Sequence, residues 1–197
     1  MKLRSMLAGV ALALIAASAP AGAQEHAGAP LPETSLYNLD SKWVNQDGAR
    51  IALSSLGGKP VVAAMGYADC KDMCPAIVAD MMWIDKHLPP GTASRVKFVF
   101  FTFDSVADTP ERLRLYADGH GLDLSHWLLL GTDDDAVREL AAALGVGYRP
   151  DGQGGFNHTA VISLLDARGN VVFQQRGTEA RSEELLAKVS GIISAAH

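Results

Sequence analysis

The chain has 197 residues, a formal net charge of −5 and only two cysteines. It is acidic and has no basic run, which excludes nucleic acid as an expected partner. A chain of this length forms one domain with a full hydrophobic core, so it needs no disulfide framework for stability.

The first residues have the features of an export signal. Lys2 and Arg4 precede an apolar run over residues 6–17, which is too short to span a bilayer comfortably. The small residues Ala21-Gly22-Ala23 then form a cleavage site. We expect a periplasmic protein without stable membrane insertion after cleavage. An uncleaved N-terminal membrane anchor is the alternative.

Three successive segments follow from this interpretation. They are a cleavable signal peptide over residues 1–23, a flexible leader over 24–34 that is rich in Ala, Gly and Pro, and one domain over 35–197.

The domain alternates strand and helix patterns. Short strands flank the hairpin signal Asp47-Gly48, buried strands are continuous apolar runs, and helices open on a proline or an aspartate. The expected strands are Leu36–Leu39, Trp43–Asn45, Ile51–Leu53, Pro60–Tyr67, Val96–Phe103, Trp127–Leu130, Ala160–Leu165 and Val171–Gln175. The expected helices run from Pro75 to Leu88, from Pro110 to Gly119, from Asp133 or Asp134 through Leu144, and from Glu179 to Ala195.

A Gly-rich loop is expected between Gly145 and Asn157. Strands that alternate with helices, followed by a terminal hairpin and helix, predict an α/β fold. We expect a thioredoxin-like three-layer fold with an N-terminal β-hairpin extension.

Both cysteines lie between an expected buried strand and an expected helix. Pro75 suits the first helical position, which predicts Cys74 as the N-cap and Cys70 in the loop before it. The positive end of the helix favours thiolate, the form that binds metal and attacks disulfides. A structural disulfide over so short a loop would stabilise the fold little, so we interpret both residues as working thiols.

Three separated segments carry a family resemblance. They are Gly66-Tyr67 with Cys70-Lys71-Asp72-Met73-Cys74-Pro75, then Asp104-Ser105-Val106-Ala107-Asp108-Thr109-Pro110, then His158-Thr159-Ala160 with Leu165-Asp166. Their order and spacing resemble those of the Sco/SenC family of thioredoxin-fold copper proteins, which help to assemble the copper centre of cytochrome c oxidase. The resemblance implies that Cys70, Cys74 and His158 bind one copper ion.

The implied ligand set is chemically consistent with copper. Two thiolates and one imidazole suit Cu(I) and, with adjustment, Cu(II), whereas zinc would want a fourth ligand or an open water position. An isolated histidine would more simply be a surface or core residue, but the matched His-Thr-Ala context favours His158 as a ligand. The glycines Gly152, Gly154 and Gly155 suggest a loop that can move to admit or release metal.

Two aspartates in the second matched segment have other interpretations. Asp104 follows a central strand, where it could orient a ligand through a hydrogen bond or face a partner, or only form a turn. Asp108 is interpreted as a helix cap.

Some residues depart from the family pattern. Lys71 stands where the family usually has proline and Ala68 where it has threonine, while Ser105 and Ala107 replace proline and arginine. These changes spare the ligands and alter the surroundings that a partner would meet.

Two functions remain open at this point. The first is a copper metallochaperone, expected to be a monomer, that serves the copper-bearing subunit of cytochrome c oxidase or another periplasmic copper protein. The alternative is a thiol–disulfide oxidoreductase that reduces client cysteines with Cys70 and Cys74. A copper carrier needs His158, whereas a reductase does not, and a classical enzyme is not expected.

Overall fold

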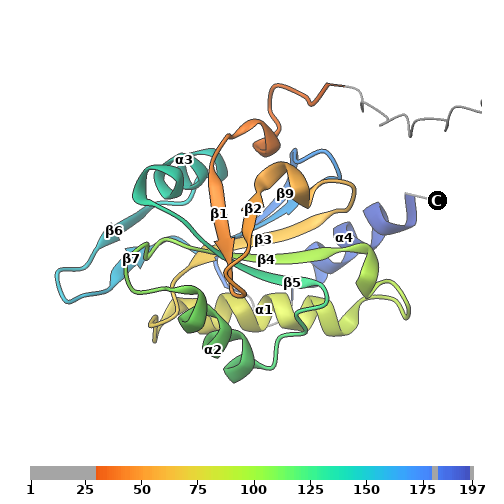
Figure 1. Ribbon diagram of the computed structural model, residues 1–197. Coiled ribbons are helices and arrows are strands. Elements are labelled where there is room, and N and C mark those ends of the chain that lie inside the picture. The colour runs from red at the N-terminus through yellow and green to blue at the C-terminus, as the bar shows by residue number, and fades with distance from the viewer. Residues whose placement is uncertain (1–29, 179–181, 196–197) are drawn as a thin grey trace, which may run out of the picture. The chain divides into compact units, whose positions relative to one another are not determined.

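The computed structural model describes residues 30–178 and 182–195 (Figure 1). The chain divides into Met1–Pro30 and Leu31–His197. The expected signal peptide, most of the expected leader and the start of the expected C-terminal helix lie outside the described residues. No helix within the described ranges is long and apolar enough to cross a membrane.

A seven-stranded sheet forms the centre of the second part, in the order β2-β1-β5-β4-β3-β8-β9. Strands β3, β4 and β5 run parallel, and the outer strands pair antiparallel. The strands are β1 (Lys42–Asn45), β2 (Arg50–Ala52), β3 (Val61–Gly66), β4 (Lys97–Thr102), β5 (Trp127–Gly131), β8 (Val161–Leu165) and β9 (Val171–Arg176). The hairpin of β1 and β2 turns at Asp47-Gly48, as predicted, and extends the sheet at one edge.

Helices cover both faces of this sheet (Figure 1). The helices are α1 (Met73–His87), α2 (Pro110–His120), α3 (Asp134–Leu144) and α4 (Glu183–Ala195). Val62 and Ala64 of β3 pack with α1, α2 and α4, whereas Val61 and Met65 pack with α3 on the opposite face. Because side chains of a strand alternate between faces, this fully buried strand supplies both cores. The three-layer thioredoxin-like prediction is confirmed.

The expected Gly-rich loop contains a second, two-stranded sheet. Strands β6 (Tyr148–Pro150) and β7 (Phe156–His158) pair antiparallel, with Tyr148 opposite His158. Gly152 and Gly154 have positive φ angles of 78° and 91°, which explains why the turn sequence obscured the strands on either side. The segment is therefore a hairpin whose second strand ends at His158.

Two other local predictions were wrong. Leu36–Asn38 is a 3-10 helix and not a strand, because the Ser35 hydroxyl accepts a hydrogen bond from Tyr37 N–H at 3.1 Å and caps the turn. Helix α1 has Asp72 as its N-cap, so Cys74 lies inside the first turn and not at the cap. Pro75 is tolerated there because the first N–H groups of a helix have no partner within it.

Candidate metal centre

Strand β3 and helix α1 hold the two cysteines at the carboxyl end of the parallel strands. The connecting loop turns where Cys70 N–H donates to the Tyr67 carbonyl at 3.3 Å, and Cys74 N–H donates to Cys70 Sγ, also at 3.3 Å. A Cβ at Gly66 would lie 2.8 Å from Cys74 Sγ and 2.6 Å from the Phe100 ring. Glycine at position 66 therefore lets the Cys74 sulfur approach the end of β3.

His158 reaches the same point from the β6–β7 hairpin. Its Nε2 atom lies 3.2 Å from Cys74 Sγ and 3.9 Å from Cys70 Sγ. The three potential ligand atoms all lie within 4.8 Å of one another. The structure thus brings together the three residues that the sequence singled out, although their use as ligands stays a prediction.

The tautomer of His158 suits a ligand. Its Nδ1 atom lies 3.3 Å from the Thr159 carbonyl oxygen, which can only accept, so this bond places the proton on Nδ1. The Nε2 lone pair is then directed to the sulfurs. Burial lowers the pKa of His158, which keeps the imidazole neutral near pH 7.

The two thiols have opposite electrostatic surroundings. Burial raises the pKa of Cys70, but hydrogen bonds from the Cys74 thiol and from N–H groups at the start of α1 outweigh it, so the net pKa is lowered. Burial and the neighbouring Cys70 both raise the pKa of Cys74. Cys70 is therefore the more readily ionised thiol, and Cys74 stays protonated until a metal or a base displaces its proton.

The Asp108 side chain is hydrogen-bonded to the loop that carries Cys70. Its carboxylate is buried and accepts hydrogen bonds from Ala68 N–H, at 2.9 Å, and from the Thr102 hydroxyl. Burial raises the pKa of Asp108, and these two bonds lower it only in part. The prediction that Asp108 caps a helix was wrong, because the Thr109 side chain caps α2 by accepting from Arg112 N–H.

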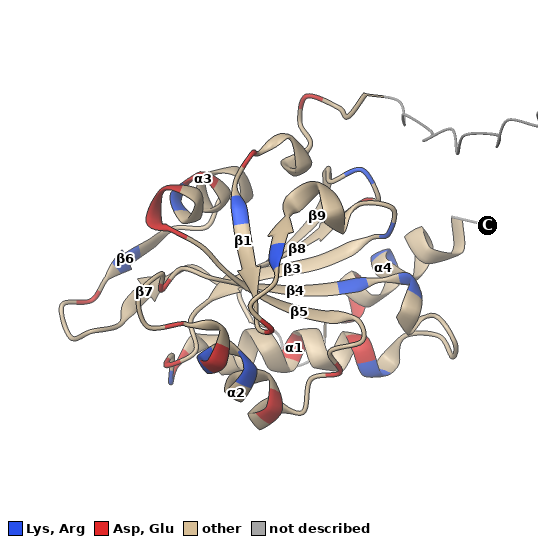
Figure 2. Ribbon diagram, in the orientation of Figure 1, with Lys and Arg blue, Asp and Glu red and all other residues tan. Residues whose placement is uncertain are grey.

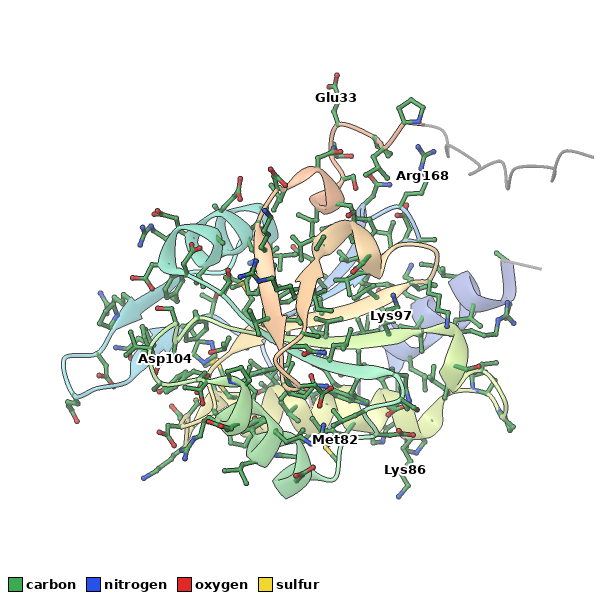
Figure 3. The ribbon with its side chains drawn as sticks, in the orientation of Figure 1. Glu33, Met82, Lys86, Lys97, Asp104 and Arg168 are labelled. Atoms are coloured by element: carbon green, nitrogen blue, oxygen red, sulfur yellow. The ribbon has the colours of Figure 1, made fainter. Side chains whose placement is uncertain are left out.

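Asp104 forms the turn after β4. Its carboxylate accepts hydrogen bonds from Val106 N–H at 3.2 Å and from Ala107 N–H at 2.9 Å. Figure 3 labels Asp104 just beyond the end of β4 and Lys97 at its opposite end. In the part of the chain that the structure describes, Asp104 makes no hydrogen bond to the cysteines or to His158. Turn formation is what the contacts show, and a role toward a partner stays a prediction.

The residues that depart from the family pattern lie around this edge. Lys71 is exposed, and the backbone N–H of Ala68 donates a hydrogen bond to the Asp108 carboxylate. The Ser105 hydroxyl donates to Asp134, at the acidic start of α3 that Figure 2 shows in red. Val106 beside it is 85% exposed, which gives this edge an apolar side chain next to acidic ones.

Comparison with known proteins bears on the whole domain. A model of the SCO1/SenC family matches residues 32–194. A SCO1 protein homolog of Bacillus subtilis is 27% identical over 138 residues, which cover 68% of this chain and 71% of that protein.

Solved structures with the same fold are more distant in sequence. ScoI of Arabidopsis thaliana, crystallised with copper bound, has a TM-score of 0.69 at 20% identity, covering 79% of this chain and 96% of that one. BsSco, a Sco family cytochrome c oxidase assembly protein in which a disulfide switch was identified, has a TM-score of 0.68 at 23% identity and covers 78% of this chain and 91% of that one.

Proposed function

The chain belongs to the SCO1/SenC family, and from that premise we propose that it is a periplasmic copper metallochaperone. It binds one copper ion through Cys70, Cys74 and His158 and delivers the ion to the copper centre of cytochrome c oxidase. The observation that carries this proposal is the convergence of two sulfurs and one neutral imidazole nitrogen within 4.8 Å. The copper-bound ScoI structure and the assembly role stated for BsSco support the choice of metal and client.

The donor set fits copper as cargo. Thiolate sulfur is a soft ligand, and a set of two thiolates and one imidazole suits Cu(I) and can adjust to Cu(II). Both thiols must be deprotonated to bind, so copper entry displaces the proton of Cys74. A client whose own thiolates or imidazoles approach the site can then replace these ligands one at a time.

Copper titration tests the binding proposal. The reduced protein is expected to bind one Cu(I) per chain, and the protein with a Cys70–Cys74 disulfide is expected to bind none, because His158 alone remains as a ligand. Competition with a chromophoric chelator and metal analysis after gel filtration measure both states. Copper retention by the oxidised protein, at the stoichiometry of the reduced one, would contradict the site.

We propose that the export signal is cleaved near Ala23, so that the mature protein begins at or near Gln24 and is released into the periplasm. Periplasmic extraction followed by intact mass measurement is expected to show this N-terminus. Retention of Met1 together with sedimentation with membranes would favour the alternative of an uncleaved anchor.

A thiol–disulfide oxidoreductase is the second candidate, favoured by the unequal thiols. The Cys70 thiolate would attack a client disulfide and form a mixed disulfide, which expels one client thiolate. Cys74, after losing its proton, would attack Cys70 Sγ and expel the second client thiolate. The client then leaves as a dithiol, and the two electrons that reduce it come from the Cys70 and Cys74 thiols, which are oxidised to a disulfide. The lowered pKa of Cys70 and the raised pKa of Cys74 fit these two roles.

A further inference from the structure

The hairpin of β6 and β7 carries His158 but belongs to a different sheet from the strand that leads to the cysteines. At its base, Thr159 N–H donates to the Gly147 carbonyl at 2.8 Å, and Gly147 N–H donates to the Thr159 hydroxyl at 3.0 Å. These bonds close the hairpin on itself. The position of the hairpin against the cysteine loop depends in addition on where β8 begins at Val161 and on contacts between the hairpin and the loop.

An aromatic cluster provides the apolar part of that contact. The Phe103 ring lies with its centroid 5.1 Å from those of Tyr148 and His158 and 5.2 Å from that of Phe156. The Tyr67 ring packs edge-on against Phe156 at 5.3 Å. Ring packing favours this position of the hairpin, and each such pair adds about 0.5–1.5 kcal/mol beyond its buried area.

The Tyr67 hydroxyl provides a directional contact. It accepts a hydrogen bond from Phe156 N–H at 3.3 Å, while the Tyr67 backbone carbonyl accepts from Cys70 N–H at 3.3 Å. One residue is thus bonded both to the cysteine loop and to the strand that ends at His158. A Cβ at Gly155 would lie 2.8 Å from the Tyr67 hydroxyl oxygen, so the hairpin backbone is in close contact with this group.

We propose that Tyr67 is a positioning residue whose hydroxyl latches the β6–β7 hairpin onto the cysteine loop and so sets the approach of His158 to the two sulfurs. The latch itself depends only on protein contacts. Its consequence for copper affinity rests on the proposed function, because it assumes that His158 is a ligand.

The change Tyr67→Phe removes the hydroxyl and keeps the ring. We expect amide hydrogen exchange at Phe156 and His158 of the copper-free protein to become about fivefold faster, which is the effect of one typical hydrogen bond. Cu(I) affinity, measured by chelator competition, is expected to fall by a similar factor of about five. Tyr148→Phe is the matched control, since it removes a hydroxyl from the same aromatic cluster for which no hydrogen bond is found among the described residues.

The change Gly155→Ala tests the same contact from the hairpin side. Its Cβ would collide with the Tyr67 hydroxyl and with Asp151, each at 2.8 Å. The collision with Asp151 is present in both backgrounds and cancels in a double-mutant cycle. Gly155→Ala is therefore expected to speed exchange at His158 more in the wild-type background than in Tyr67→Phe.

The outcomes separate the latch from the copper site. The proposed latch is contradicted if the amide hydrogens of residues 156 and 158 exchange as slowly in Tyr67→Phe as in Tyr148→Phe. It is also contradicted if the effects of Tyr67→Phe and Gly155→Ala on amide exchange are additive. If the wild-type protein binds no copper, the proposed function fails, but the exchange comparison on the copper-free protein still decides the latch. Faster exchange in Tyr67→Phe with unchanged copper affinity would overturn the claim that the latch sets the approach of His158.

Discussion

Replacing His158 by alanine is expected to weaken Cu(I) binding by more than about a hundredfold, while the free energy of unfolding changes little. Loss of a group that only orients a ligand typically costs about 10- to 100-fold in metal affinity, so loss of the ligand itself should cost more. The side chain is only partly buried, which limits the effect on stability. Chelator competition and urea unfolding measure the two quantities on the same preparation.

The same variant separates the two candidate functions. Thiol–disulfide exchange depends on thiolate fraction, nucleophilicity and access, none of which requires a third ligand. We expect His158→Ala to reduce a generic disulfide at nearly the wild-type rate and to fail to restore oxidase assembly in a deletion strain. His87→Ala, which removes an exposed imidazole from α1, is the control. Full restoration by His158→Ala would mean that the protein acts mainly as a reductase.

Replacing Asp108 by alanine is expected to lower the free energy of unfolding by about 2–4 kcal/mol. The change leaves two donors without an acceptor, the half-buried Ala68 N–H and the buried Thr102 hydroxyl, and each such loss costs about 1–3 kcal/mol when the donor is buried. Part of that cost is offset, because the carboxylate is itself unfavourably buried, as its raised pKa shows. Urea unfolding at neutral pH measures the loss.

Two further variants control this result. Asp108→Asn keeps an acceptor oxygen for the two donors and removes the buried charge, so it is expected to lose less than about 1 kcal/mol. Asp104→Ala removes a carboxylate that, within residues 30–178 and 182–195, bonds only to N–H groups of its partly exposed turn, and a loss below about 1 kcal/mol is expected. Equal losses for Asp108→Ala and Asp104→Ala would show that the buried acceptor is not what holds the loop.

The layers of the fold were predictable because their signals are local. The apolar run of β3 and the Pro110 opening of α2 each specify an element without reference to the rest of the chain. The β6–β7 hairpin was missed because its strands are three residues long and its aromatic side chains pack on Phe103 and Tyr67, which lie far away in sequence.

The candidate site was likewise predictable from the sequence only in part. The convergence of Cys70, Cys74 and His158 could be expected from the matched motifs, and the geometry agrees. The support from Asp108 could not, because it joins residues 40 positions apart through a backbone N–H group. The only sequence signal for it was the second aspartate in the segment Asp104–Pro110, whose position suggested a helix cap.

The three potential ligands differ in depth, and this difference imposes an order on exchange with solvent or with a client. Cys74 is fully buried and Cys70 is 8% exposed, whereas His158 is only partly buried. An incoming nucleophile can reach His158 and Cys70 first, and Cys74 would then be the last of the three to be displaced from a bound ion. If copper is delivered from this site as proposed, successive ligand substitutions would keep the metal coordinated throughout, so the transfer rate would follow the concentration of the acceptor and not a spontaneous dissociation step.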